Sequence, residues 1–111
     1  MVRTTTSPTL EDEKDLSKVH MRMPMFEALA RGYVEAANPF LTKAERSFLT
    51  FSGKLITFMI GMRFLTDFLL GDIYFRVHRS EHNLDRCRTQ FRLVESIAKQ
   101  EKKMQQFVDK L

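Results

Sequence analysis

Residues 52–70 constrain the fold more than any other part of the chain, because this stretch has almost no polar face. A helix that is apolar on all sides is either buried in a larger core or spans a membrane. Lys54, Arg63 and Asp67 argue against a membrane span, since charges deep in hydrocarbon are costly. We therefore expect a central, buried helix. The rest of a 111-residue chain can hardly cover every side of it, which implies missing partners. Its apolar residues are Leu55, Ile56, Phe58, Met59, Ile60, Met62, Phe64, Leu65, Phe68, Leu69 and Leu70.

The remaining segments also follow helical rather than strand spacing. Apolar residues recur every three or four positions from Pro24, which suits a first helical turn, to the Asn38-Pro39 pair, which ends the helix. Thr42 and Glu45 form a capping box for the next helix. A break at residues 52–53 would separate it from the apolar helix, which Gly71 ends. A last helix runs from Ser80 or Asn83 to the C-terminus. The prediction is an all-α fold of about four helices.

The first 18 residues differ from the rest in composition. They are polar, with a TTTSP run followed by EDEKD, so we expect an extended polar arm at 1–18 and one helical domain at 19–111. No apolar segment follows Arg3, which excludes a secretory signal at this position. The single cysteine, Cys87, excludes a disulfide framework and fits a reducing compartment. A cytoplasmic location is the expectation, with an inert, buried Cys87 thiol.

The charge pattern gives weak support to nucleic-acid binding. The formal charge is only +4, from 18 basic and 14 acidic residues. Five arginines between positions 76 and 92 do not form one narrow stripe, so we expect a solvated, partly salt-bridged surface and no nucleic-acid partner. His78 and His82 lack a third ligand nearby, so no metal site is predicted.

Arg63 and Asp67 are the polar residues of greatest interest, because they lie four positions apart on one face of an apolar helix. Two interpretations are open: a buried ion pair, or a cavity in which one of them binds a polar ligand. Asp72 could face the same cavity. The sequence contains no Gly-rich phosphate loop, no nucleophile elbow and no kinase catalytic loop, so no catalytic residue is predicted.

Several segments resemble one family in the same order and spacing. They are EDEKDLSKV from Glu11, FEALARGYVEAA from Phe26, LTKAERSFL from Leu41, and RFLTDFLLGDIYFRVHRSEHNLDRCRTQFRLVESI from Arg63. Together they resemble the C-terminal end of aminoglycoside phosphotransferase-type small-molecule kinases, and most of all the N-acetylhexosamine 1-kinase-like members. That family implies a two-lobed, kinase-like fold that transfers the γ-phosphoryl group of ATP to a sugar with magnesium.

By this resemblance the chain corresponds to the last helices of the C-terminal lobe, which line the acceptor pocket. The nucleotide lobe, the catalytic loop and the metal-binding Asp of the family lie upstream of the matched segments. The expectation is a truncated, non-catalytic fragment that holds no cofactor itself, with ATP and magnesium implied only for the full-length family. Arg63, Asp67 and Tyr74 are the candidate acceptor-pocket residues. The expected partner is the remainder of a kinase or another copy of the chain, and the alternative is a free-standing helical self-association module.

Overall fold

The computed structural model describes residues 1–111 and contains helices but no strands, which confirms the all-α prediction. Three helices are long and two are short. In chain order the elements are α1 (Val2–Thr6), the 3₁₀ turn η1 (Leu16–Lys18), α2 (Met23–Ala37), α3 (Lys43–Ser47), α4 (Leu49–Leu69) and α5 (His82–Asp109).

Local sequence signals set most helix boundaries. Pro24 lies in the first turn of α2, and the Thr42 hydroxyl accepts the Glu45 N–H (3.1 Å) at the start of α3. Gly71 follows α4 with φ +99°, a conformation that glycine adopts readily. Its N–H donates to the Phe68 carbonyl (3.2 Å), and the next N–H donates to the Asp67 carbonyl (2.8 Å). This pattern is a Schellman motif, as Gly71 predicts.

The break between α3 and α4 lies at Phe48, not at residues 52–53 as expected. Gly53 stays inside α4 because it serves packing: a Cβ there would lie 3.0 Å from Cγ1 of Val2. The glycine therefore admits α1 to the side of α4 instead of ending a helix.

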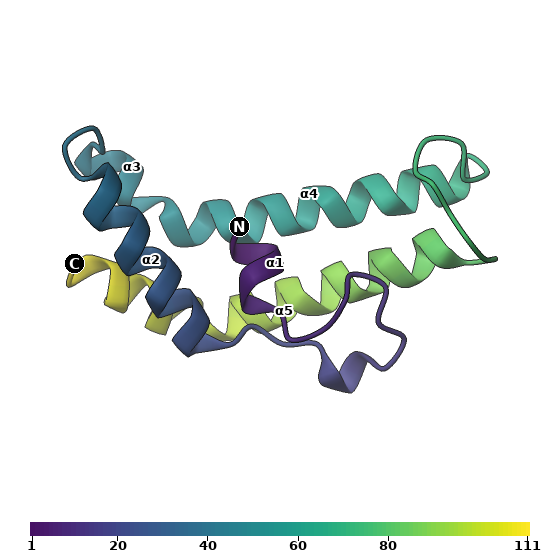
Figure 1. Ribbon diagram of the computed structural model, residues 1–111, viewed down its shortest axis with the longest axis horizontal. Coiled ribbons are helices and arrows are strands. Elements are labelled where there is room, and N and C mark those ends of the chain that lie inside the picture. Colours follow the sequence, from purple (N-terminus) through teal and green to yellow (C-terminus); the bar gives the residue numbers. More distant parts are fainter.

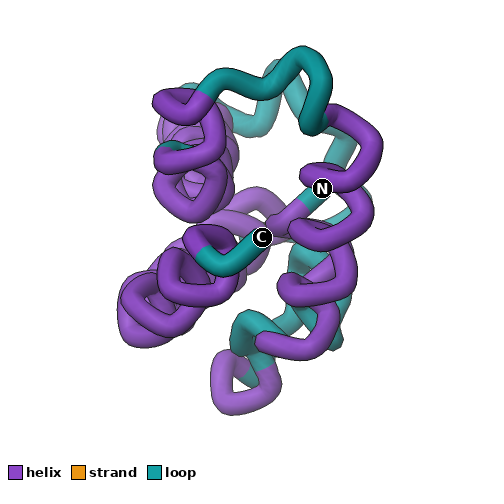
Figure 2. The backbone as a smooth tube through the Cα atoms, turned by 90° about the vertical axis from the view of Figure 1, so that its left-hand side faces the viewer, coloured by secondary structure: helices purple, strands orange, loops and turns teal.

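Helices α4 and α5 lie side by side and run in opposite directions, joined at one end by the loop of residues 70–81 (Figure 1). At the other end α2 crosses α5. Seen from that end, the rest of the chain lies to one side of the α4–α5 pair (Figure 2). The molecule measures 45 × 27 × 19 Å, with a radius of gyration of 15.2 Å. A compact domain of this length has a radius near 13 Å, so the fold is elongated and open.

The hydrophobic core lies at the end of the molecule where α2 meets α5. It joins the segment before α2, the inner face of α2 and the C-terminal half of α5. Its fully buried members are Val19, Met21, Phe26, Ala30, Leu93, Ile97, Met104 and Val108. None of them comes from α4, so the most apolar helix of the sequence contributes little to the core.

Helix α4 buries a face of mostly small and polar residues together with Phe64, and it exposes most of its large apolar residues. Its buried positions are Thr50, Gly53, Thr57, Gly61, Phe64 and Asp67. Its outward residues include Phe51, Leu55, Ile56, Phe58, Met59 and Met62, which are each 41–48% exposed. The prediction of a central, buried helix is therefore wrong within this chain, because only the small face fits against α5. No helix combines the length and apolar character that a membrane span needs.

The prediction of an extended arm at 1–18 is also wrong in part. Residues 2–6 form α1, which packs against α2 and α4, and Thr6 is fully buried. The Arg22 guanidinium donates to the carbonyls of Thr5 (3.1 Å) and Ser7 (3.2 Å), and its Nε donates to that of Thr6 (3.0 Å). One arginine thus satisfies carbonyls that the end of α1 leaves without partners.

The following segment is held along α5 by hydrogen bonds. The Thr89 hydroxyl donates to the Glu13 carbonyl (2.8 Å). The Met21 N–H donates to the Ser96 hydroxyl, and the Met21 carbonyl accepts from the Gln100 amide (2.8 Å each). The polar composition of residues 7–18 gave no hydrophobic pattern from which this contact with α5 could be predicted. The segment is held both by these hydrogen bonds and by Val19 and Met21, which are buried in the core against α5.

The close contact between α4 and α5 predicts that Gly61→Ala destabilises the fold. The new Cβ would lie 2.7 Å from Cε1 of Phe91, and overpacking of this kind costs about 1–3 kcal/mol. Gly32→Ala is the matched control: its Cβ would meet nothing within 4 Å on α2, so it should stabilise by about 0.5–1 kcal/mol. Urea denaturation measures both, and equal stabilities for the two variants would contradict the prediction.

Candidate functional site

The structure brings the three predicted site residues together. Arg63 and Asp67 lie in the last turns of α4, and the loop of residues 70–81 places Tyr74 beside them. The three line a surface hollow of about 400 Å³, together with Thr66, Leu70, Ile73 and Phe75. We name it the acceptor hollow only after the role that the sequence resemblance implies for Arg63, Asp67 and Tyr74.

Asp67 organises the loop instead of pairing with Arg63. Its side chain is buried, and its Oδ1 accepts the N–H groups of Ile73 (3.1 Å) and Tyr74 (2.8 Å). Its Oδ2 accepts the Phe75 N–H (3.0 Å) and the Asn83 amide (2.7 Å). Burial of the carboxylate acts to raise the pKa of Asp67, but these hydrogen bonds outweigh it and hold the pKa below its ordinary value of 3.8. With four donors bound, this carboxylate shapes the hollow and is not free to bind a ligand.

Arg63 lies on the aromatic rings of the loop. Its guanidinium carbon is 5.7 Å from the ring centroid of Tyr74 and 5.5 Å from that of Phe75. The two rings meet edge to face at 4.9 Å. Tyr74 is 73% exposed, so a guanidinium, a phenol and an aromatic face are open to solvent at one place. The buried ion pair considered from the sequence is absent.

Asn83, in the first turn of α5, was missed as a site residue because we read it only as a helix start. It is fully buried, and its amide also donates to Asp72 Oδ1 (3.0 Å). Asp72 has a φ of +60° and turns its carboxylate to Asn83. The sequence signal for this network is the GD pair followed by SEHN, a turn followed by polar residues at a helix start.

A second polar network ties the loop to the N-terminal segment. His82 Nδ1 accepts the His78 N–H (3.2 Å), which places the ring proton on Nε2, 2.9 Å from Asp12 Oδ2. Arg79 pairs with Asp12 (3.6 Å) and with Asp85. Burial acts to raise the pKa of Asp12, but the His82 hydrogen bond and neighbouring charges lower it overall. No group of three His, Cys, Asp or Glu residues is arranged to hold a metal ion.

The other residues singled out in the sequence have structural surroundings. Arg86 lies near Glu11 and Arg92 pairs with Glu95 (3.1 Å), which confirms a partly salt-bridged arginine surface. Cys87 is buried, and that burial raises the pKa of its thiol. These surroundings agree with the expectation that Cys87 is buried.

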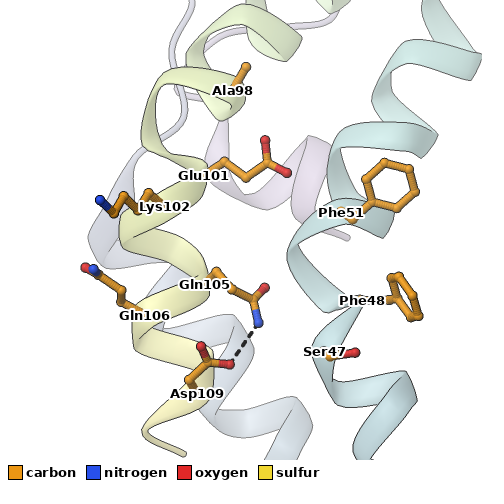
Figure 3. Close-up of a pocket in the computed structure, with 9 residues that line it drawn as sticks. All are labelled: Ser47, Phe48, Phe51, Ala98, Glu101, Lys102, Gln105, Gln106 and Asp109. Atoms are coloured by element: carbon orange, nitrogen blue, oxygen red, sulfur yellow. Dashed lines mark hydrogen bonds between the residues drawn. The ribbon is translucent and has the colours of Figure 1, made fainter.

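A larger hollow, of about 760 Å³, lies elsewhere, between the α3–α4 junction and the C-terminal half of α5 (Figure 3). Glu101 extends into it and binds Lys54 Nζ (2.7 Å), which explains an acidic residue on the apolar stripe of α5. Gln105 donates to Asp109 (2.9 Å), while the rings of Phe48 and Phe51 point away from α5 (Figure 3). This groove contains none of the predicted residues, so the acceptor hollow is the stronger candidate.

A comparison of the chain with models of known protein families gave no match.

The hydrogen bonds of Asp67 predict a pH-dependent loss of stability. Because folding lowers its pKa, the ionised carboxylate stabilises the fold above about pH 4, and this stabilisation is lost as the pH falls through and below 3.8. Asp67→Asn should therefore unfold at a lower urea concentration than the wild type at neutral pH. The difference should shrink near pH 3.

Asp109→Asn is the control, because Asp109 is an exposed carboxylate in the last turn of α5. It should unfold as the wild type does at both pH values. Equal stability of Asp67→Asn and the wild type at neutral pH would show that the carboxylate does not hold the loop.

Proposed function

We propose that this chain is the helical end of a kinase-like C-terminal lobe of the aminoglycoside phosphotransferase type, and that its acceptor hollow contributes to binding an N-acetylhexosamine. The choice of this family rests on the resemblance of the sequence segments that begin at Glu11, Phe26, Leu41 and Arg63. The role is non-catalytic: the chain would shape the acceptor side of the pocket, and the residues that bind ATP and magnesium would come from the remainder of the kinase.

The observation that carries the proposal is the uncovered apolar face of α4. Folded monomers of 13.1 kDa expose about 6,400 Å² of surface on average, whereas this chain exposes 7093 Å². The excess of about 700 Å² approaches the 800 Å² that each partner buries in a standard interface. Large side chains such as Phe51, Ile56 and Met59 account for part of it. A surface of this kind supports a lobe from which the neighbouring helices are missing.

The chemistry of the acceptor hollow suits a sugar. A guanidinium has five N–H donors for hydroxyl and carbonyl oxygens, and an aromatic ring offers an apolar face. Arg63 and Tyr74 present these groups together, and Ile73 and Leu70 add apolar wall for an acetyl methyl group. Asp67 is a positioning residue, because it holds the backbone that carries Tyr74.

The proposal predicts weak but specific binding of N-acetylglucosamine to the chain. Saturation-transfer NMR should detect contact with the sugar ring, and Tyr74→Ala should weaken binding roughly three- to tenfold through loss of the aromatic surface. Tyr33→Ala is the control, since Tyr33 is a half-exposed tyrosine on α2 outside the hollow. Absence of saturation transfer in the wild type, or an equal loss in both variants, would contradict the acceptor role.

A second function, self-association, is favoured by the spacing of the apolar residues that lie outside the buried face of α4. Phe51, Leu55, Phe58, Met62, Leu65 and Leu69 recur at alternating intervals of four and three along α4. This heptad spacing is the pattern with which one helix packs along another. A second copy of α4 would cover the face that the first leaves open.

Self-association predicts a dimer in sedimentation velocity that Leu55→Lys converts to a monomer. Leu55 is 42% exposed in the middle of the face, so a lysine there would place a charge in the dimer contact without disturbing the core. Phe40→Lys, at a residue 84% exposed outside the face, is the control and should stay dimeric. If the wild-type chain is a folded monomer, self-association is contradicted, and the proposal of a kinase-like lobe remains.

A further inference from the structure

Three arginines from three separate parts of the fold converge on one hollow that the proposed function does not use. Arg3 comes from α1, Arg76 from the loop of residues 70–81 and Arg86 from α5. The hollow has a volume of about 330 Å³, and one carboxylate, Glu11, lies among the arginines. From this arrangement we infer a binding site for a phosphate monoester on a small molecule with an apolar or ring-shaped body.

The positive charge of this hollow is only partly balanced. Glu11 Oε2 lies 3.6 Å from Arg3 Nη1, and its Oε1 lies 3.4 Å from Arg86 Nε. Both distances exceed those of strong charge-assisted hydrogen bonds, which are near 2.7–2.9 Å. Arg76 forms no ion pair. Three guanidinium groups thus face one loosely held, half-exposed carboxylate.

Arg86 is the best-organised of the three. Its Nη1 donates to the Asn83 side chain (3.0 Å) and to the Arg76 carbonyl (3.1 Å), which fixes the guanidinium plane. Its guanidinium carbon also lies 5.6 Å from the Phe64 ring centroid. The Nε of Arg86 is nevertheless buried and makes no hydrogen bond, because its 3.4 Å contact with Glu11 Oε1 is an ion pair only. A buried donor without a partner is costly, and a phosphate oxygen in the hollow would supply the missing acceptor.

The apolar lining of the hollow favours a ligand with more than a bare anion. Ile60, Phe64 and Phe75 form this lining, which we call the apolar floor. A phosphate oxygen matches the forked geometry of guanidinium groups, and a doubly charged monoester balances the excess positive charge. The apolar floor would hold the group that the phosphate is attached to. Glu11 then acts as an internal competitor that the phosphate displaces.

The test uses phenyl phosphate as the probe, with methyl phosphate as the analogue that lacks the ring. In ¹H–¹⁵N spectra of the wild-type chain, phenyl phosphate should shift the Arg86 Nε–H signal at low-millimolar concentration, and methyl phosphate should require more ligand. Arg76→Gln should weaken binding roughly tenfold, the value of one hydrogen bond to a charged group. Glu11→Gln should tighten it roughly two- to fivefold, as removal of a weak competing ion pair predicts.

Arg88→Gln is the matched control, because Arg88 is an exposed arginine of α5 outside the hollow. Its affinity for phenyl phosphate should equal that of the wild type. The inference is overturned by an unmoved Arg86 Nε–H signal, by weaker binding in Glu11→Gln, or by an equal loss in Arg76→Gln and Arg88→Gln. Equal affinity for the two esters would overturn the role of the apolar floor.

Discussion

The close packing of α4 on α5 decides where every other part of the molecule can lie. Gly61 leaves room for the Phe91 ring, and Thr57 turns its hydroxyl back to the Gly53 carbonyl (2.7 Å), so that no polar atom of this threonine is left without a partner. Only a face of small residues permits this approach. The consequence is geometric: once the small side of α4 faces inward, its large apolar side must face outward.

Polar interactions then stabilise the loop after α4 and the end of α1, which a hydrophobic core would stabilise in a more compact domain. Asp67 holds the loop after α4 through three backbone N–H groups, and Arg22 binds the carbonyls at the end of α1. Buried polar groups specify one arrangement when all of their hydrogen bonds are satisfied. These contacts give an elongated chain defined loops although its core is confined to one end.

The surfaces proposed for function result from the packing of α4 on α5 and from the polar contacts that hold the loops. The acceptor hollow and the hollow lined by Arg3, Arg76 and Arg86 share Phe75 as a lining residue. Both depend on the same loop and on Asn83, whose amide binds Asp67 and whose carbonyl oxygen binds Arg86. The uncovered face of α4 is a separate surface, formed by large apolar side chains such as Phe51, Ile56 and Met59.

The sequence by itself determined the three long helices and the boundaries marked by Pro24, Thr42 and Gly71, because caps, prolines and glycines act within a few residues of chain. It did not predict α1 or the break between α3 and α4 at Phe48. It also identified Arg63, Asp67 and Tyr74 as a group, although not their roles. Tertiary structure decided which face of α4 is buried, since a helix that is apolar all round carries no periodicity to orient it, and the fit of Gly61 to Phe91 depends on residues 30 positions apart. It decided the docking of residues 1–22 for a related reason: the burial of Val19 and Met21 and the hydrogen bonds to distant polar groups depend on partners in α5, and they leave no periodic pattern in this segment alone.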